Sequence, residues 1–209
     1  MIDGTQGFHF IGLTLRKRCA MLVFSEGLLM VDQSLPGWGV MTHPELLRLF
    51  PDVPDAAKAA GCTDIAQQLL STARYGRGPL VALGGGRGEF TTVEERDPEY
   101  DDKVGQRLDG RSLVTEWQQA HPQGAYVWNA KQLQAARNAP ALLGLFEPDH
   151  MRYEIERKDD PSGEPSLAEL TKAAISTLSR HKEGYVLMVE GARIDHANHS
   201  GNAYRALSD

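Results

Sequence analysis

Residues 185–199 read Y-V-L-M-V-E-G-A-R-I-D-H-A-N-H, and this stretch decides the fold class of the chain. Its first part, Tyr185–Val189, is a nearly continuous apolar run of strand length. Such runs are typical of strands that are buried on both faces of a parallel sheet. Glu190 follows directly, and open α/β sheets place their ligand crevices outside the carboxyl ends of their strands. The stretch therefore predicts a buried parallel strand with a candidate site at its end.

The segments before this strand alternate between helical and strand patterns. Apolar residues at helical spacing predict helices, and short apolar runs bounded by turn residues predict strands. The expected elements are a helix over 65–70, a strand over 79–83, a helix from Ser112, strands over 125–128 and 142–146, and a helix from Ser166. This alternation favours an α/β fold with a mainly parallel sheet flanked by helices.

Two of the expected helices have a defined buried face. In the helix from Ser112, the spacing of Leu113, Trp117 and Ala120 places them on one side. In the next helix, Ser166 and Glu169 form a capping box, in which each side chain satisfies a free backbone N–H of the first turn. The apolar side chains that this helix keeps together are Leu167, Leu170, Ala174 and Leu178.

The chain divides into two parts by composition. Residues 1–43 are rich in glycine, with scattered aromatic residues and no sustained pattern, so we expect a divergent N-terminal segment. Residues 44–209 are expected to form one α/β domain, and this length is sufficient for a buried core. The helical pattern over 202–209 stops without a capping residue, so the domain is expected to be incomplete.

Charge and hydropathy exclude some functional classes. The net charge of −6 argues against a nucleic-acid-binding surface, which normally shows a basic patch. No apolar run reaches the roughly 18 to 20 residues of a membrane span. The two cysteines, Cys19 and Cys62, cannot form a disulfide framework. The basic residues 16–18 precede a short apolar run without a recognisable cleavage site, so no targeting segment is predicted and the compartment stays open.

Three residues after the predicted strand have side chains suited to metal binding. Asp195 and His199 are four positions apart, so a single helical turn would place both on one side. Zinc accepts both carboxylate oxygen and imidazole nitrogen, whereas Glu190, a hard oxygen ligand, suits magnesium better. The alternative is a polar turn with a solvated aspartate and surface histidines. The spacing alone leaves both interpretations open.

Other polar motifs are assigned no role in the chemistry. The glycine-rich residues 84–88 lack the Gly-Lys-Ser/Thr ending of a phosphate-binding loop, so a strand-to-loop transition is favoured. Arg87, within that run, is expected to be structural or at the surface. The acidic pairs at 94–95, 101–102 and 159–160 lie in polar stretches and are expected to be solvated loop charges.

The run from Gly184 to His199 closely resembles the metal-ligand segment of alkaline phosphatases. Further segments resemble that family in the same order along the chain. They are Gly61–Ala66, Leu83–Arg87, Arg107–Trp117, Tyr126–Asn129 and Leu143–Pro148. The resemblance covers about residues 52–209, roughly three quarters of the chain. It implies an alkaline-phosphatase-like fold, of which this chain holds a part.

The resemblance also implies a set of metal ligands. Family members hold two zinc ions and one magnesium ion around a nucleophilic serine. By position, Asp195 and His199 resemble ligands of one zinc, and Glu190 resembles a magnesium ligand. His196 adjoins the motif without being one of its expected ligands. Eukaryotic-type members also hold calcium, and the matching positions here are the backbone oxygen of Phe146 and the carboxylates of Glu147 and Glu164.

The activity implied by the resemblance is the hydrolysis of phosphate monoesters. No Asp-Ser-Ala nucleophile segment is recognisable, and two zinc ligands fall short of the three that a catalytic zinc normally takes from the protein. We therefore assign no catalytic residue and expect an inactive fragment. The alternatives are a non-catalytic divalent-metal-binding protein, an incompletely folded product, or a phosphodiesterase or sulfatase of the wider superfamily. The segments between Arg107 and Pro148 count against the last of these.

Family members are usually exported and dimeric, so the resemblance also allows a homodimer. The cysteine that matches Cys62 can be disulfide-bonded in the family. Its usual partner segment is not recognisable here.

Overall fold

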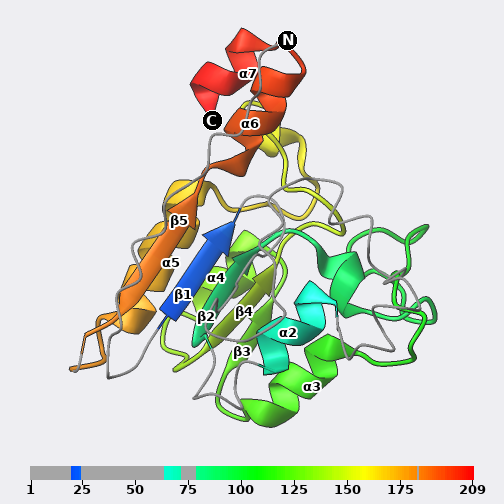
Figure 1. The fold of residues 1–209 in the computed structure, drawn as a ribbon, viewed down its shortest axis with the longest axis vertical. Coiled ribbons are helices and arrows are strands. Elements are labelled where there is room, and N and C mark those ends of the chain that lie inside the picture. Colours follow the sequence, from blue (N-terminus) through cyan, green and yellow to red (C-terminus); the bar gives the residue numbers. More distant parts are fainter. Residues whose placement is uncertain (1–19, 25–63, 72–78, 183) are drawn as a thin grey trace, which may run out of the picture.

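A computed structural model describes residues 20–24, 64–71, 79–182 and 184–209 of the protein. These residues contain a five-stranded sheet in the order β3-β4-β2-β1-β5, in which every pair of neighbouring strands is parallel (Figure 1). The strands are β1 (Ala20–Phe24), β2 (Val81–Gly84), β3 (Ala125–Val127), β4 (Leu142–Leu145) and β5 (Val186–Glu190). The predicted α/β fold with a parallel sheet is confirmed.

Helices cover both faces of this sheet. The α-helices are α2 (Ile65–Ser71), α3 (Leu113–Ala120), α4 (Ala130–Ala135), α5 (Leu167–Leu178), α6 (Ala192–His199) and α7 (Ala203–Ser208). Within the described residues, two short 3-10 helices, η3 (Arg87–Phe90) and η4 (Arg157–Asp159), lie in the connections. Helices α6 and α7 lie beyond the carboxyl end of β5, away from the body of the sheet (Figure 1). None of the helices in the described segments is long and apolar enough to cross a membrane.

The core consists of two layers, one on each face of the sheet. Val81 and Leu83 of β2 pack with α4 and α5, whereas Ala82, between them in sequence, packs with α2 and α3. Successive strand residues point to opposite faces, and both faces of β2 are therefore buried. β2 and β4 are buried along their whole length, and burial of apolar surface stabilises the fold by about 25 cal/mol per Å².

The helices begin largely where their sequence patterns predict. The Ser166 hydroxyl oxygen accepts a hydrogen bond from the backbone N–H of Glu169, and the Glu169 carboxylate accepts one from the backbone N–H of Ser166. The capping box at the start of α5 is therefore confirmed. The predicted face of α3 is partly wrong. Leu113 and Trp117 are buried, but Ala120 is exposed and Val114 is buried in its place. Ala120 is the last residue of α3.

Strand β5 is formed as expected, but the prediction that it is buried on both faces is wrong. Val186 and Val189 are 45% and 41% exposed. Within the described residues, β5 pairs only with β1 and therefore lies at an edge of the sheet. A continuous apolar run cannot distinguish a central strand from an edge strand, because the difference depends on neighbours distant in sequence.

Strand β1 comes from within residues 1–43 and lies between β2 and β5. The division of the chain at residue 43 stays a prediction. Cys19 and Cys62, and with them any disulfide between them, lie outside the described residues.

Candidate metal-binding sites

Asp195 and His199 lie together on α6, as their spacing predicts. The Nε2 atom of His199 is 3.3 Å from Oδ2 of Asp195. Both side chains are largely exposed, at 69% for His199 and 65% for Asp195, so both are accessible to an ion from solvent. A carboxylate and an imidazole at this separation can act as two ligands of one divalent cation.

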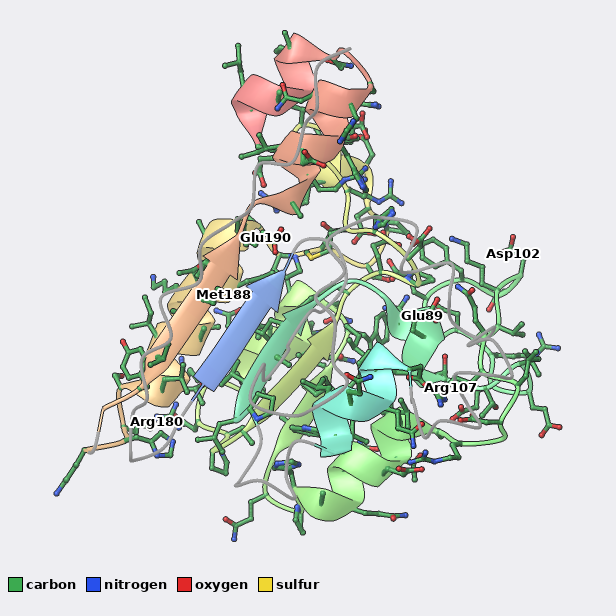
Figure 2. All side chains as sticks on the ribbon, in the orientation of Figure 1. Glu89, Asp102, Arg107, Arg180, Met188 and Glu190 are labelled. Atoms are coloured by element: carbon green, nitrogen blue, oxygen red, sulfur yellow. The ribbon has the colours of Figure 1, made fainter. Side chains whose placement is uncertain are left out.

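Glu190 ends β5 close to the start of α6 (Figure 2). Partial burial, and then the negative charge of Asp195, raise the pKa of Glu190 above its ordinary value. The ligand roles of Glu190, Asp195 and His199 stay predictions.

His196 has different neighbours from those of the Asp195–His199 pair. Its Nδ1 atom lies 2.9 Å from Nη1 of Arg193, and its ring meets that of His150 edge-on, with centroids 4.7 Å apart. Burial, and then the positive charges of His150 and Arg193, lower the pKa of His196. A lowered pKa keeps this imidazole neutral at physiological pH.

A second group of acidic side chains lies near the carboxyl end of β4. Oxygen atoms of Glu99, Glu147 and Asp160 all lie within 4.8 Å of one another, and we call these three residues the acidic cluster. Within the described segments, it is the one set of three or more acidic, histidine or cysteine side chains with ligand atoms this close. Glu147 is buried, and the side chains of Glu99 and Asp160 are each only 1% exposed.

Glu164 is buried beside the acidic cluster. Both of its carboxylate oxygens accept the backbone N–H of Arg152, each at 3.1 Å. Burial raises the pKa of Glu164 to about 8, and the nearby charges of Glu147 and Asp160 act in the same direction. Burial, and then the facing carboxyl of Asp160, likewise raise the pKa of Glu99. Crowded and desolvated carboxylates of this kind are stabilised by a cation.

Three basic or hydroxyl side chains contact the acidic cluster. Tyr100 donates its hydroxyl hydrogen bond to Glu147 at 3.0 Å, and Arg152 donates through Nε to the same carboxylate at 3.1 Å. Arg87 donates through Nη2 to Glu99 at 2.9 Å. These contacts fix the orientation of the carboxylates before any ion binds.

The glycine-rich loop after β2 holds the segment that carries Glu147. The backbone N–H groups of residues 86–88 donate to the carbonyls of residues 147–149 at 2.6 to 2.9 Å. At Gly85 a Cβ atom would collide with the backbone oxygen of Asp149, so the two segments approach as closely as they do because residue 85 is glycine. The backbone donors of the loop thus have partners within the protein. The predicted strand-to-loop transition is confirmed.

The model of the alkaline phosphatase family matches residues 49–209, which is more than half of the chain. The chain belongs to the alkaline phosphatase family. It is similar to the membrane-bound alkaline phosphatase of Bombyx mori, with 44% identity over 154 residues that make up 71% of this chain and 27% of that protein. It is also similar to the tissue-nonspecific alkaline phosphatase of Felis catus, with 40% identity over 166 residues that cover 76% of this chain and 31% of that protein.

A solved structure supports the same family. The crystal structure of Thermus thermophilus alkaline phosphatase superposes with a TM-score of 0.56 and 36% identity, over 69% of this chain and 26% of that chain. The chain thus spans about three tenths of the length of the curated relatives that it matches. The alkaline phosphatase family is generally metal-dependent. The carboxylates and the histidine at and beyond the end of β5, and those of the acidic cluster with Glu164, are therefore candidate metal ligands.

The acidic cluster fits the calcium that the family resemblance implies. Oε1 of Glu99 and Oδ1 of Asp160 are buried and have no hydrogen-bond partner within the described structure. Calcium takes oxygen ligands, mainly carboxylates and carbonyls, and an all-oxygen donor set of this kind suits it. Phe146, whose backbone oxygen is the other expected ligand, is buried directly after β4 and next to Glu147.

The sequence interpretation of this region is incomplete. The sequence patterns assign no role to Glu99 and predict a solvated acidic pair at 159–160. This interpretation is wrong for Asp160, whose side chain is almost wholly buried. It is correct for Asp102, which is exposed and extends away from the body of the protein (Figure 2). No spacing pattern connects residues 99, 147 and 160, because the fold brings them together from three different loops.

Proposed function

We propose that this chain carries part of the metal-binding apparatus of a phosphomonoesterase of the alkaline phosphatase family. The observation that supports this is the convergence of Asp195 and His199, at 3.3 Å, within the segment matched by the family. In this proposal Asp195 and His199 hold one zinc ion and Glu190 holds magnesium. When bound, such ions act as Lewis acids toward phosphoryl oxygen and lower the pKa of bound water.

The chain's own residues prepare this binding. The Asp195 carboxylate and the His199 ring face each other from successive turns of α6, so little ordering is needed when a cation comes between them. Glu190 adds a second negative charge, after that of Asp195, at the end of β5. The raised pKa of Glu190 indicates that its carboxylate is destabilised, so a cation that neutralises the group has a further favourable interaction there.

We further propose that the chain alone does not turn over phosphate monoesters. A catalytic zinc normally takes three protein ligands, and this chain provides two for the zinc assigned here. No recognisable nucleophile segment accompanies them. The acidic cluster favours the alternative reading of the isolated chain as a divalent-metal-binding protein. We propose that the cluster, with Glu164 and the Phe146 carbonyl, binds calcium and has a structural role.

Zinc titration followed by thermal unfolding tests the zinc assignment. Zinc at about 100 times its dissociation constant should stabilise the chain by about 2.7 kcal/mol. The variant His199→Gln should lose this stabilisation. The control His181→Gln, which removes a histidine just after α5, should keep it. Equal stabilisation of the two variants would contradict the assignment of His199.

The assay for activity uses p-nitrophenyl phosphate at alkaline pH with added zinc and magnesium. We expect no turnover above background. Hydrolysis by the chain that disappears in Asp195→Ala would contradict the proposed inactivity, while supporting the assignment of Asp195 to the site.

A further inference from the structure

Arg152 contacts the acidic cluster with its side chain and Glu164, beside the cluster, with its backbone N–H. Its Nε donates to Glu147 at 3.1 Å and lies 3.6 Å from Oδ1 of Asp160, which is ion-pair distance without a hydrogen bond. Its Nη2 donates to the hydroxyl of Tyr100 at 3.1 Å, and that hydroxyl itself donates to Glu147. The guanidinium is therefore placed where it opposes the same carboxylates that a divalent cation would bind.

We propose that Arg152 is a tethered counter-cation of the acidic cluster that competes with the bound divalent cation and sets the affinity of the site. This inference rests on the calcium-type site proposed above and assigns to Arg152 a role that the carboxylate ligands do not have. The carboxylates provide attraction for any cation. Arg152 determines how much of that attraction remains for an ion from solution.

The balance of charge supports this role. Four carboxylates, those of Glu99, Glu147, Asp160 and Glu164, lie in or beside the cluster. The guanidinium of Arg87, which also reaches Glu99, is shared with Asp97. When these carboxyl groups are ionised, the single positive charge of Arg152 cannot neutralise the negative charge of the cluster.

The pattern of hydrogen bonds leads to the same conclusion. Oε1 of Glu99 and Oδ1 of Asp160 are buried without a hydrogen-bond partner in the described part of the chain, although Arg152 is close by. An unpartnered buried oxygen is costly, and a divalent cation can contact several oxygens at once where a directional N–H donor reaches one. Arg152 thus satisfies the cluster only in part, which leaves a driving force for an ion to displace it.

Arg87 and Arg152 differ in their exposure to solvent, and only Arg152 is exposed enough for an entering ion to displace its guanidinium. Arg87 is fully buried, and Asp97 and a carbonyl oxygen hold it in place. The Arg152 side chain is 31% exposed, so its guanidinium can swing toward solvent when an ion enters. Its backbone N–H can remain on Glu164 throughout, because that contact does not depend on the side chain.

Calcium binding to the full chain, measured by isothermal titration calorimetry, tests this role without any activity assay. Arg152→Gln removes the charge and keeps the backbone contact to Glu164. It should bind calcium at least about tenfold more tightly than the wild type, because affinity in such sites follows the net ligand charge. Arg152→Lys retains the charge and should stay within about threefold of the wild type.

Two further variants control the measurement. Arg111→Gln removes an arginine that pairs with Glu116 and, among the described residues, makes no hydrogen bond or ion pair with the cluster, so it should leave calcium affinity unchanged. Glu147→Gln removes a ligand of the cluster itself. Calcium binding that remains in Glu147→Gln is assigned to another site and is subtracted from the binding measured for the wild type and the Arg152 variants.

The outcomes separate this inference from the proposed site. If neither the wild type nor Arg152→Gln binds calcium at the cluster, both the site and the role of Arg152 are wrong. If the wild type binds and a folded Arg152→Gln binds equally or more weakly, only the role of Arg152 is wrong.

If Arg152→Gln does not fold, the role of Arg152 is tested by NMR on the wild type. The Nε–H resonance of Arg152 is assigned by its loss in Arg152→Lys and is followed as calcium is added. It should shift when calcium saturates the cluster, because Nε–H then loses its carboxylate partner. A resonance that does not move at saturation overturns the proposal.

Discussion

Replacement of Arg87 by methionine should be among the most destabilising single substitutions in this chain. The Arg87 guanidinium is fully buried, and its Nε and Nη2 donate to the two oxygens of Asp97 at 2.7 and 2.8 Å. The same Nη2 donates to Glu99 at 2.9 Å, and Nη1 donates to the carbonyl of Leu145 at 2.9 Å. Methionine fills much of the volume but provides none of these four donations.

The expected magnitude follows from the burial of the partners. The side chains of Asp97 and Glu99 are almost inaccessible to water, so solvent cannot replace the lost guanidinium. Removing one partner of a buried ion pair costs about 3–5 kcal/mol, because the remaining charge is buried without compensation. At roughly 2–4 °C per kcal/mol for a domain of this size, the melting temperature should fall by roughly 6–20 °C.

Urea unfolding followed by circular dichroism provides the assay. The matched control is Arg111→Met, because Arg111 also pairs with a carboxylate, that of Glu116, but both side chains are partly exposed to solvent. A pair of this kind contributes about 0–1 kcal/mol. If Arg87→Met costs no more than Arg111→Met, the buried network does not stabilise the fold and the reasoning from burial is refuted.

Two further predictions concern the glycine-rich loop and the 3-10 helix that follows it. Burial, and then the charge of Asp149, raise the pKa of Glu89 to about 7, so between about pH 4.3 and about pH 7 the folded state holds a proton that the unfolded state releases. The free energy of unfolding should therefore fall as pH rises through this window, and Glu89→Gln should flatten that profile in urea titrations; an unchanged profile would contradict the assignment. Gly85→Ala places a Cβ against the backbone oxygen of Asp149 and should lower the free energy of unfolding by about 1–3 kcal/mol, measured in the same way. Wild-type stability in this variant would mean that the two loops separate freely.

Features encoded within a few residues could be predicted from the sequence. The capping box of α5 and the positions of β2, β3 and β4 depend on neighbouring residues, and the structure has them where the patterns indicate. The meeting of Asp195 and His199 is of the same kind, because one helix contains both.

Features that depend on distant neighbours could not be predicted. The exposure of Val186 and Val189 follows from the edge position of β5, and the position of a strand in a sheet is not encoded in its own residues. Asp160 has the sequence context of a solvated loop acid, yet it is buried against Glu99 and Glu147. Tyr100 and Glu147, which are hydrogen-bonded across this region, are 47 positions apart.

The Asp195–His199 pair and the acidic cluster with Glu164 differ in exposure and in how firmly their side chains are held. Asp195 and His199 are exposed and provide two ligands where a catalytic zinc takes three, so zinc should bind there weakly. The acidic cluster and Glu164 are buried and oriented by Tyr100, Arg87 and Arg152 before an ion arrives. The carboxylates of the acidic cluster and Glu164 therefore lose little conformational entropy when an ion binds. Their affinity for a cation depends mainly on the net charge of the site. For this reason we expect calcium binding to persist in the chain even where phosphatase activity is absent.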